Sequence, residues 1–184
     1  MPASTVNLRE LQTPIKARYR EHPEEARIEC VARSAGSDLA DPLHCEVTLD
    51  SAPGLTLRSG AHPGVGGKGD VPCSGDLLVA ALLACQETTI RMVAAAMGIE
   101  LEAIEVSATA TADLRGTLAM AREVPVGLTG IDCRVRVTVR DDGRGERAQR
   151  LLENAEKYCI VLNTLRNGVA VTTDFQVETV RATL

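Results

Sequence analysis

The sequence is poor in aromatic residues, with no tryptophan, two tyrosines and one phenylalanine among 184 residues. Proteins that bind single-stranded nucleic acid stack bases on exposed aromatic rings, and this chain has almost none to offer. Its net charge is −5, and no block of lysine and arginine dominates any segment. The electrostatic footprint of a nucleic-acid-binding protein is therefore missing too, and we expect no nucleic-acid partner.

The sequence also lacks segments that would direct it to a membrane. The first 14 residues have neither the basic start nor the apolar run of a signal peptide. The longest apolar run, residues 77–85, is shorter than a membrane span. We expect a cytoplasmic protein with no membrane partner. Its six cysteines should then be mostly reduced, so that any disulfide would be catalytic or redox-sensing.

Patterns that hold metals or nucleotides are missing as well. No CxxC occurs, and no cysteine–histidine pair has the spacing of a structural zinc site. The segment GVGGKG at 64–69 matches the dinucleotide-binding fingerprint by letter, but no strand leads into it and no helix opens on its last glycine. We expect neither a metal nor a cofactor, and interpret 64–69 as a flexible loop near a site.

What the chain does contain is aliphatic residues: 45% of it is hydrophobic, enough to bury a core. Alternating apolar and polar residues predict strands at 15–20, 26–33, 43–49, 55–58, 101–114, 128–140 and 169–178. Helical spacing predicts helices at 75–97, capped by Ser74, and at 145–166. This order of elements predicts an α+β fold, because the regular alternation of a doubly wound sheet is absent.

Each predicted helix carries a cysteine well inside it. Cys85 ends the part of the first helix that is apolar on every face, and Cys159 lies on the apolar stripe of the second. Free cysteines are common in protein cores, so packing alone remains an alternative for both.

Four further cysteines receive no assigned role. Cys30, Cys45 and Cys133 lie on predicted strands among apolar neighbours, where a cysteine acts as a small buried hydrophobe. Cys73 precedes a helix, where the dipole favours a thiolate, but a loop residue without chemistry is the simpler interpretation.

Several segments resemble the OsmC/Ohr family, the osmotically induced and organic hydroperoxide resistance proteins. Residues 74–85, SGDLLVAALLAC, resemble its first active-site helix, and residues 113–118, 153–159 and 163–165 resemble later segments in the right order. The match covers roughly 55–178. Ser74 and Gly75 stand where better-known members carry Pro-Glu, and Ile160 replaces the usual proline after the second cysteine. We identify the chain as a member of a divergent OsmC-like branch.

The resemblance implies antiparallel sheets around two long central helices in an intertwined homodimer, with active sites at the subunit interface. It implies a single OsmC-like domain over 1–184, in which 1–54 forms atypical N-terminal strands and 55–178 the family-like core. It also implies reduction of organic hydroperoxides without a metal or cofactor. Cys85 would be the peroxidatic thiolate and Cys159 the resolving thiol, and an external dithiol would reduce the disulfide.

Charged residues near the cysteines are candidates for supporting roles. The resemblance implies an acidic residue at the start of the first helix, for which Asp76 stands one place late. It also implies an arginine from the N-terminal strands that stabilises the thiolate, and the candidates are Arg18, Arg20 and Arg58.

Helical spacing predicts which cysteine attacks. Positions three and four residues away share the face of the cysteine. For Cys85 these include the hydroxyls of Thr88 and Thr89, which can donate to a thiolate, whereas Glu156 disfavours a thiolate at Cys159. With neither cysteine predicted at a helix N-terminus, we expect an arginine to lower the pKa of Cys85 below that of Cys159.

Two other functions remain open at this point. The chain could be a non-enzymatic OsmC-like module that binds an apolar small molecule at the dimer interface. It could also be a redox sensor that forms the Cys85–Cys159 disulfide without turnover. Consumption of peroxide in the presence of a dithiol would separate a peroxidase from both.

Overall fold

The computed structural model describes residues 6–140 and 145–179. The helices are α1 (Leu8–Glu21), α2 (Ser74–Met97), α3 (Leu114–Thr117), α4 (Gly145–Tyr158) and α5 (Ile160–Asn167), with 3₁₀ turns η1 (Pro23–Ala26) and η2 (Pro63–Val65). The strands are β1 (Ala32–Arg33), β2 (His44–Leu49), β3 (Thr56–Gly60), β4 (Leu101–Ala112) and β5 (Leu128–Val139).

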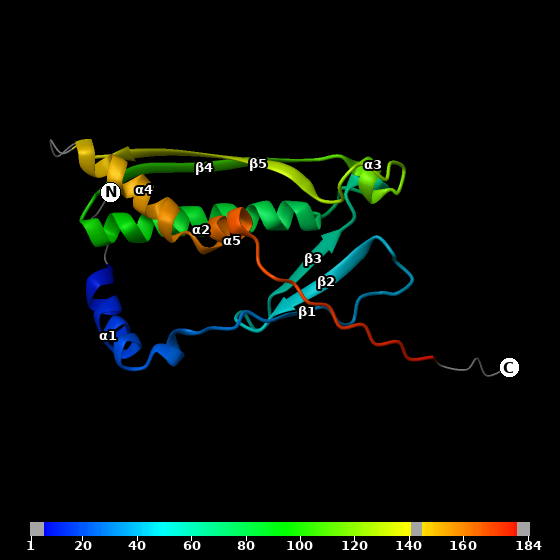
Figure 1. The fold of residues 1–184 in the computed structure, drawn as a ribbon, viewed down its shortest axis with the longest axis horizontal. Coiled ribbons are helices and arrows are strands. Elements are labelled where there is room, and N and C mark those ends of the chain that lie inside the picture. Colours follow the sequence, from blue (N-terminus) through cyan, green and yellow to red (C-terminus); the bar gives the residue numbers. More distant parts are fainter. Residues whose placement is uncertain (1–5, 141–144, 180–184) are drawn as a thin grey trace.

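The elements form a layer of helices between two antiparallel sheets. The long strands β4 and β5 pair with each other, with Ile104 opposite Val137 and Val106 opposite Val135. Helix α2 runs along this ribbon with α4 and α5 beside it, and the sheet β1-β2-β3 lies on the other side of α2 (Figure 1). The predicted α+β class and the antiparallel sheets are confirmed.

Two groups of buried side chains hold α2 to its neighbours. Around Ile90 and Leu151, which are almost fully buried, the inward-facing aliphatic side chains of β4 and β5 close over α2 and α4. Around Leu82, Cys159 and Leu162, α2 packs against α5 and the far half of β5. Burying an aliphatic side chain of this size contributes about 1.5–3 kcal/mol, so these contacts fix α5 against α2 without aromatic residues.

The strand predicted at 15–20 is wrong, because the segment lies in helix α1. Residues 15–20 alternate apolar and polar over six positions, yet Leu8, Leu11 and Ile15 also recur at helical spacing. The side chain of Asn7 accepts the N–H of Glu10 and caps the helix. The cap and the longer helical pattern together favour a helix over the strand that the short alternation predicts.

The other strands of the first third are confirmed in part. Residues 43–49 and 55–58 correspond to β2 and β3, while the strand predicted at 26–33 pairs only at Ala32 and Arg33. Cys30 and Cys45 are exposed, so the prediction that they are buried is wrong, and Cys133 is half-buried. The short first sheet has one open face, and alternation alone does not tell which face is covered.

Helix α2 begins at Ser74, and Cys73 rather than the predicted Ser74 is its N-cap. The N–H of Cys73 donates to the carboxylate of Asp76 at 2.9 Å, which closes the first turn. Among the described residues, α2 is the one helix that is long and apolar enough to span a membrane by length and composition. The central helix of a packed layer meets the same test, and the sheet and helices that cover α2 explain its composition.

The helix predicted at 145–166 is two helices, α4 and α5, separated at Cys159. Cys159 has an extended backbone, with φ −73° and ψ 109°, and is the N-cap of α5. The side-chain amide of Asn163 donates to the carbonyls of Glu156 and Lys157, which the break leaves without helical donors, and also to that of Cys159. The apolar stripe continues through the break, so periodicity does not reveal it. The expectation that neither cysteine lies at a helix N-terminus is wrong for Cys159.

The strand predicted at 169–178 is not paired with another strand in the described part of the chain. The side chains of Val171, Phe175 and Val177 alternate as predicted but are 81%, 84% and 86% exposed. A strand needs the edge of another strand to satisfy its backbone, and a single copy of the chain does not supply that edge here.

A buried histidine ties the loop before α2 to the start of β2. The side chain of His44 is 7% exposed, with Nδ1 2.7 Å from Asp41 and Nε2 3.0 Å from Asp70. The hydrogen bond to Asp70, followed by that to Asp41, raises the pKa of His44. His44 in turn lowers the pKa of both carboxyls, with smaller contributions from Lys68 at Asp41 and Arg58 at Asp70.

We predict that the His44 contacts lose their stabilising effect at alkaline pH. Because the folded-state pKa of His44 lies above its ordinary value, the contribution is complete below about pH 6.5 and disappears as the pH rises through the folded-state pKa. The two aspartates have lowered pKa values, so their contribution is lost only in acid, as the pH falls below about 3.9. Urea unfolding at about pH 5.5 and about pH 8.5 measures the difference.

In the variant His44→Gln this loss of stability between the two pH values should be absent. The matched control is His22→Gln, since His22 is exposed and should leave the loss unchanged. Equal pH dependence in wild type and His44→Gln would contradict the prediction.

Candidate active site

The sulfur atoms of Cys85 and Cys159 face each other at 3.2 Å, and the thiol of Cys159 donates to the sulfur of Cys85. Cys85 comes from the middle of α2, and Cys159 from the N-cap of α5. Both pack in the cluster centred on Leu82 and Leu162. The structure thus brings together the two cysteines that the sequence singled out, at a separation from which a disulfide needs only a small movement.

The pKa of the Cys85 thiol lies below its ordinary value. Burial by itself raises this pKa, because it disfavours the charged thiolate. Four hydrogen-bond donors oppose burial and outweigh it: the N–H of Val161, the thiol of Cys159, the hydroxyl of Thr89 and the N–H of Ile160. The lowered pKa makes Cys85 easier to deprotonate than an ordinary cysteine.

The pKa of the Cys159 thiol is shifted in the opposite direction. Burial raises it, the N–H of Leu162 lowers it, and the neighbouring Cys85 raises it further. The side chain of Cys159 is fully buried, whereas Cys85 is only partly covered. The pair thus consists of a partly covered cysteine with a lowered pKa and a buried thiol that donates to it.

The residues predicted to support Cys85 on α2 differ in their placement. Thr89 donates to Cys85 as predicted, whereas Thr88 points to solvent. Asp76 caps the start of α2, and the helical rise places it about 13 Å from Cys85 along the axis. Spacings of three and four residues both fit one face of a helix, so the sequence could not choose between the two threonines.

Glu156 is close to Cys159 in sequence but is engaged elsewhere. Its carboxylate is half-exposed and lies 2.5 Å from the guanidinium of Arg166. The causes that dominate the pKa of Cys159 are burial and its two neighbours, the amide of Leu162 and the sulfur of Cys85. The position of the carboxylate therefore does not account for the raised pKa.

Of the three candidate arginines, which were expected on N-terminal strands, only Arg58 lies on a strand, whereas Arg18 and Arg20 lie on helix α1. Arg18 is on α1, 3.0 Å from Glu25, and Arg20 is exposed on the same helix. Arg58 is on β3 and acts on Asp70. None of the three is among the groups that dominate the pKa of Cys85.

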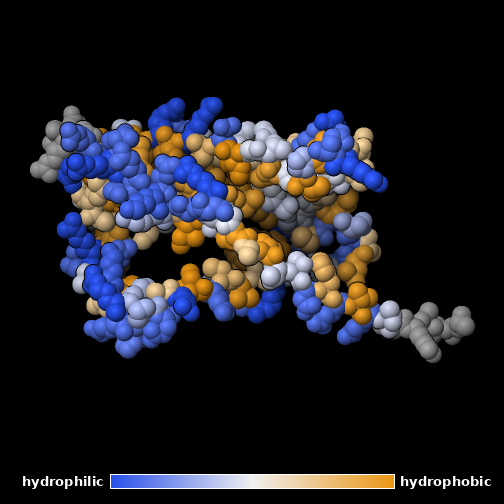
Figure 2. Space-filling model, in the orientation of Figure 1, coloured by the Kyte–Doolittle hydropathy of each residue, from blue (hydrophilic) through white to orange (hydrophobic). Residues whose placement is uncertain are grey.

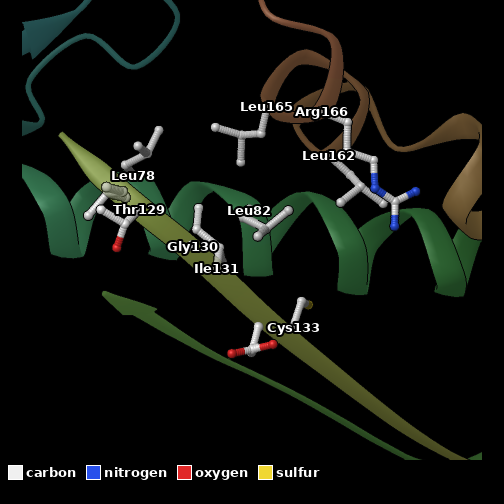
Figure 3. Close-up of a pocket in the computed structure, with 11 residues that line it drawn as sticks. Leu78, Leu82, Thr129, Gly130, Ile131, Cys133, Leu162, Leu165 and Arg166 are labelled. Carbon is white, nitrogen blue, oxygen red and sulfur yellow. The ribbon is translucent and has the colours of Figure 1, made fainter. Parts of the chain in front are cut away.

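A pocket of about 620 Å³ opens beside the cysteine pair. Leu78 and Leu82 of α2 and Leu162 and Leu165 of α5 line it, facing residues 128–133 of β5 (Figure 3). Its lining also includes two charged residues, Arg166 of α5 and Asp132 of β5. The sequence does not reveal this pocket, because its walls come from three separate segments. The alternation along β5 marks only the inward positions of one wall.

Cys133 also lines this pocket and packs on the cysteine cluster. Burial raises the pKa of the Cys133 thiol, and Arg166 lowers it by less. Within residues 6–140 and 145–179, no three His, Cys, Asp or Glu side chains are grouped as a metal site requires.

The fold and the facing thiols define a class of small α+β proteins that hold a cysteine pair between two central helices. The family model described as OsmC-like protein matches residues 67–174, more than half of the chain, and the chain belongs to this family. No curated protein matches the chain.

Solved structures of several bacterial proteins share this fold. An OsmC-like protein of unknown function from Vibrio cholerae is 14% identical with a TM-score of 0.59, over 75% of this chain and 94% of that one. An organic hydroperoxide resistance protein from Elizabethkingia anophelis is 19% identical with a TM-score of 0.56, over 78% and 92%. A third, from Legionella pneumophila, described as an organic hydroperoxide resistance protein OsmC and predicted redox protein, is 20% identical with a TM-score of 0.54, over 77% and 91%. These low identities fit a divergent branch.

We predict that brief alkylation at mildly acidic pH labels Cys85 well before Cys159, because the thiolate is the reactive form. The variant Thr89→Val removes one donor at constant volume and should slow labelling of Cys85 roughly threefold to tenfold, the effect of one hydrogen bond. Thr88→Val is the matched control and should not slow it. Peptide mass mapping separates the six cysteines. Faster labelling of Cys159 would contradict the assignment.

Proposed function

We propose that the protein is a thiol-dependent peroxidase that reduces organic hydroperoxides. The observation that carries the proposal is the hydrogen bond from the Cys159 thiol to the Cys85 sulfur at 3.2 Å. This contact places a lowered-pKa sulfur and a second thiol within reach of each other. Those are the two groups that reduction of a peroxide by a dithiol requires.

In the proposed reaction, the Cys85 thiolate attacks one oxygen of the hydroperoxide and the O–O bond breaks. The departing alkoxide takes a proton and leaves as the alcohol, and Cys85 becomes a sulfenic acid. The sulfur of Cys159 then attacks the sulfur of Cys85, and water leaves as the disulfide forms. An external dithiol restores both thiols by exchange and becomes a disulfide itself, so it supplies the two electrons.

The pocket supports an organic substrate rather than hydrogen peroxide. Leucine and isoleucine side chains of α2, α5 and β5 line it beside polar groups, and it shares Leu82 and Leu162 with the cysteine cluster. An alkyl group bound there would leave water and gain contact area at about 25 cal/mol per Å². Two solved relatives bear the name organic hydroperoxide resistance protein, which supports the same substrate class. A cytoplasmic location, where dithiol reductants are abundant, remains part of the proposal.

We predict that the protein consumes cumene hydroperoxide faster than hydrogen peroxide when dithiothreitol is supplied. Cys85→Ser should abolish consumption, because it removes the attacking sulfur. Cys159→Ser should still form a sulfenic acid, trapped by dimedone after one addition of peroxide. Cys45→Ser, at an exposed position on β2, is the control and should behave as wild type.

Each other outcome of this assay has a definite meaning. Oxidation of Cys85 and Cys159 to a disulfide without turnover would identify a redox sensor. Absence of any oxidation at Cys85 would leave the apolar binding module. Reduction of peroxide by Cys85→Ser, or equal rates with both peroxides, would contradict the proposal.

We also propose that the protein is a homodimer. The single chain exposes 14456 Å², whereas a compact protein of 19.5 kDa exposes about 8,500 Å². Figure 2 shows an opening between the helical layer and the N-terminal segment, with hydrophobic residues at its edges. Segment 169–178 presents an apolar face without a partner strand in the described chain. A second copy of the chain would cover these surfaces.

We predict that sedimentation at decreasing concentration shows the dimer persisting until structure is lost, without a stable folded monomer. Phe175→Asp places a charge on the apolar face of segment 169–178 and should weaken the dimer. Gln176→Asp places the same charge on the opposite face and is the matched control. A well-folded monomer of the wild type at low concentration would contradict the prediction.

A further inference from the structure

We infer that the peptide N–H groups of Val161 and Ile160, in the first turn of α5, stabilise the thiolate form of Cys85 and make both residues positioning residues. The placement of the first turn of α5 beside Cys85 is a feature of the structure and does not depend on the proposed function. Its importance for peroxide reduction rests on the proposed function.

The first turn of α5 has backbone N–H groups that no carbonyl of the same helix can accept. An α-helix leaves its first N–H groups without an intrahelical acceptor. The carbonyl of Cys159 accepts the N–H of Asn163 at 3.1 Å, which fixes the start of the ladder at Cys159. The N–H groups of Val161 and Ile160 therefore need another acceptor. The sulfur of Cys85, 3.2 Å from the sulfur of the N-cap residue Cys159, is the acceptor beside them, and both N–H groups lower its pKa.

The sulfur of Cys85 belongs to the middle of one helix but lies at the N-terminus of another. Cys85 lies in the middle of α2, whose own dipole has no effect there. Its sulfur nevertheless lies at the N-terminus of a second helix, because α5 begins where α4 breaks off. Such an N-terminus carries roughly half a positive charge and favours a thiolate. The positive end of α5 thus takes the place that a cationic side chain would otherwise fill.

The charged groups around Cys85 do not supply a competing explanation. On the α5 side the titratable neighbour is Cys159, which donates to Cys85 as a thiol. On the β5 side it is Cys133, in the same cluster and with a raised pKa. Glu156 of α4 and Arg166 of α5 lie 2.5 Å apart and pair with each other, and no charged side chain of the described chain is among the causes of the Cys85 pKa shift. The remaining donor, Thr89, comes from α2 itself.

The backbone of Ile160 can be tested apart from its side chain. The side chain is 72% exposed, so its removal disturbs little packing. Proline is favoured at the first position of a helix and lacks the N–H. Cys159, with φ −73° and ψ 109°, already has the extended conformation that a residue before proline requires. Ile160→Pro therefore deletes one hydrogen bond to Cys85 while the start of α5 is kept.

The experiment measures the alkylation rate of Cys85 against pH in the full-length protein. Ile160→Ala, which keeps the N–H, is the reference for Ile160→Pro. We expect the proline variant to titrate about one pH unit higher, with labelling about tenfold slower below that midpoint. Urea unfolding of both variants checks that α5 still forms. Superimposable pH profiles for the two folded variants would overturn the inference.

A second variant covers the case in which Ile160→Pro does not fold. Val161→Pro removes the neighbouring donor at the second helical position, where proline is also tolerated, and Val161→Ala is its reference. The same upward shift is expected, and its absence in folded protein would overturn the inference.

Failure of the inference and failure of the proposed function are distinguishable. Alkylation requires no peroxide, so a shifted profile in a protein without peroxide turnover would support the inference and reject the peroxidase. Peroxide turnover together with an unshifted alkylation profile would support the peroxidase and reject the inference. Where both hold, the rate with cumene hydroperoxide should peak at a higher pH in Ile160→Pro than in Ile160→Ala, with the KM for the peroxide unchanged.

Discussion

The break between α4 and α5 at Cys159 is the feature on which the site depends. In a continuous helix, the N–H groups that follow Cys159 would bond to carbonyls of the preceding turn and would be unavailable to another helix. The break releases them, and the side-chain amide of Asn163 donates to the carbonyls of Glu156 and Lys157, left without helical donors at the end of α4. One extended residue thus sets both the 3.2 Å contact between the sulfurs and the donors that surround Cys85.

The aliphatic core determines how closely α5 approaches α2. Leu82 and Leu162 meet at the centre of the cluster, and the half-buried side chains of β5 close it from the ribbon side. Because no large ring intervenes, α5 can lie against α2 with its N-terminus at Cys85. The same aliphatic side chains continue into the pocket, so the surface that positions the cysteines also supplies the wall for an apolar ligand.

The sequence predicts α2, β4 and β5 well because each is long and has one clear periodicity. It predicts the cysteine pair through the resemblance to a family, since spacing alone left Cys85 and Cys159 as ordinary core residues. It fails where two patterns compete, as in α1, and where one residue leaves the helix, as at Cys159. It also gives no sign of the backbone N–H groups beside Cys85, because peptide groups occur at every position and leave no mark in a sequence.

The opposite pKa shifts of the two cysteines are linked, and the link gives the proposed reaction its order. The pKa of Cys159 is raised by burial and, in addition, by the neighbouring Cys85, while the amides of Leu162 and Val161 lower it. When Cys85 becomes a neutral sulfenic acid, its negative charge disappears, and with it one cause that kept Cys159 protonated. The amides at the start of α5 then favour a thiolate at Cys159. The same helix N-terminus that prepares the first sulfur for attack thereby prepares the second sulfur once the first has reacted.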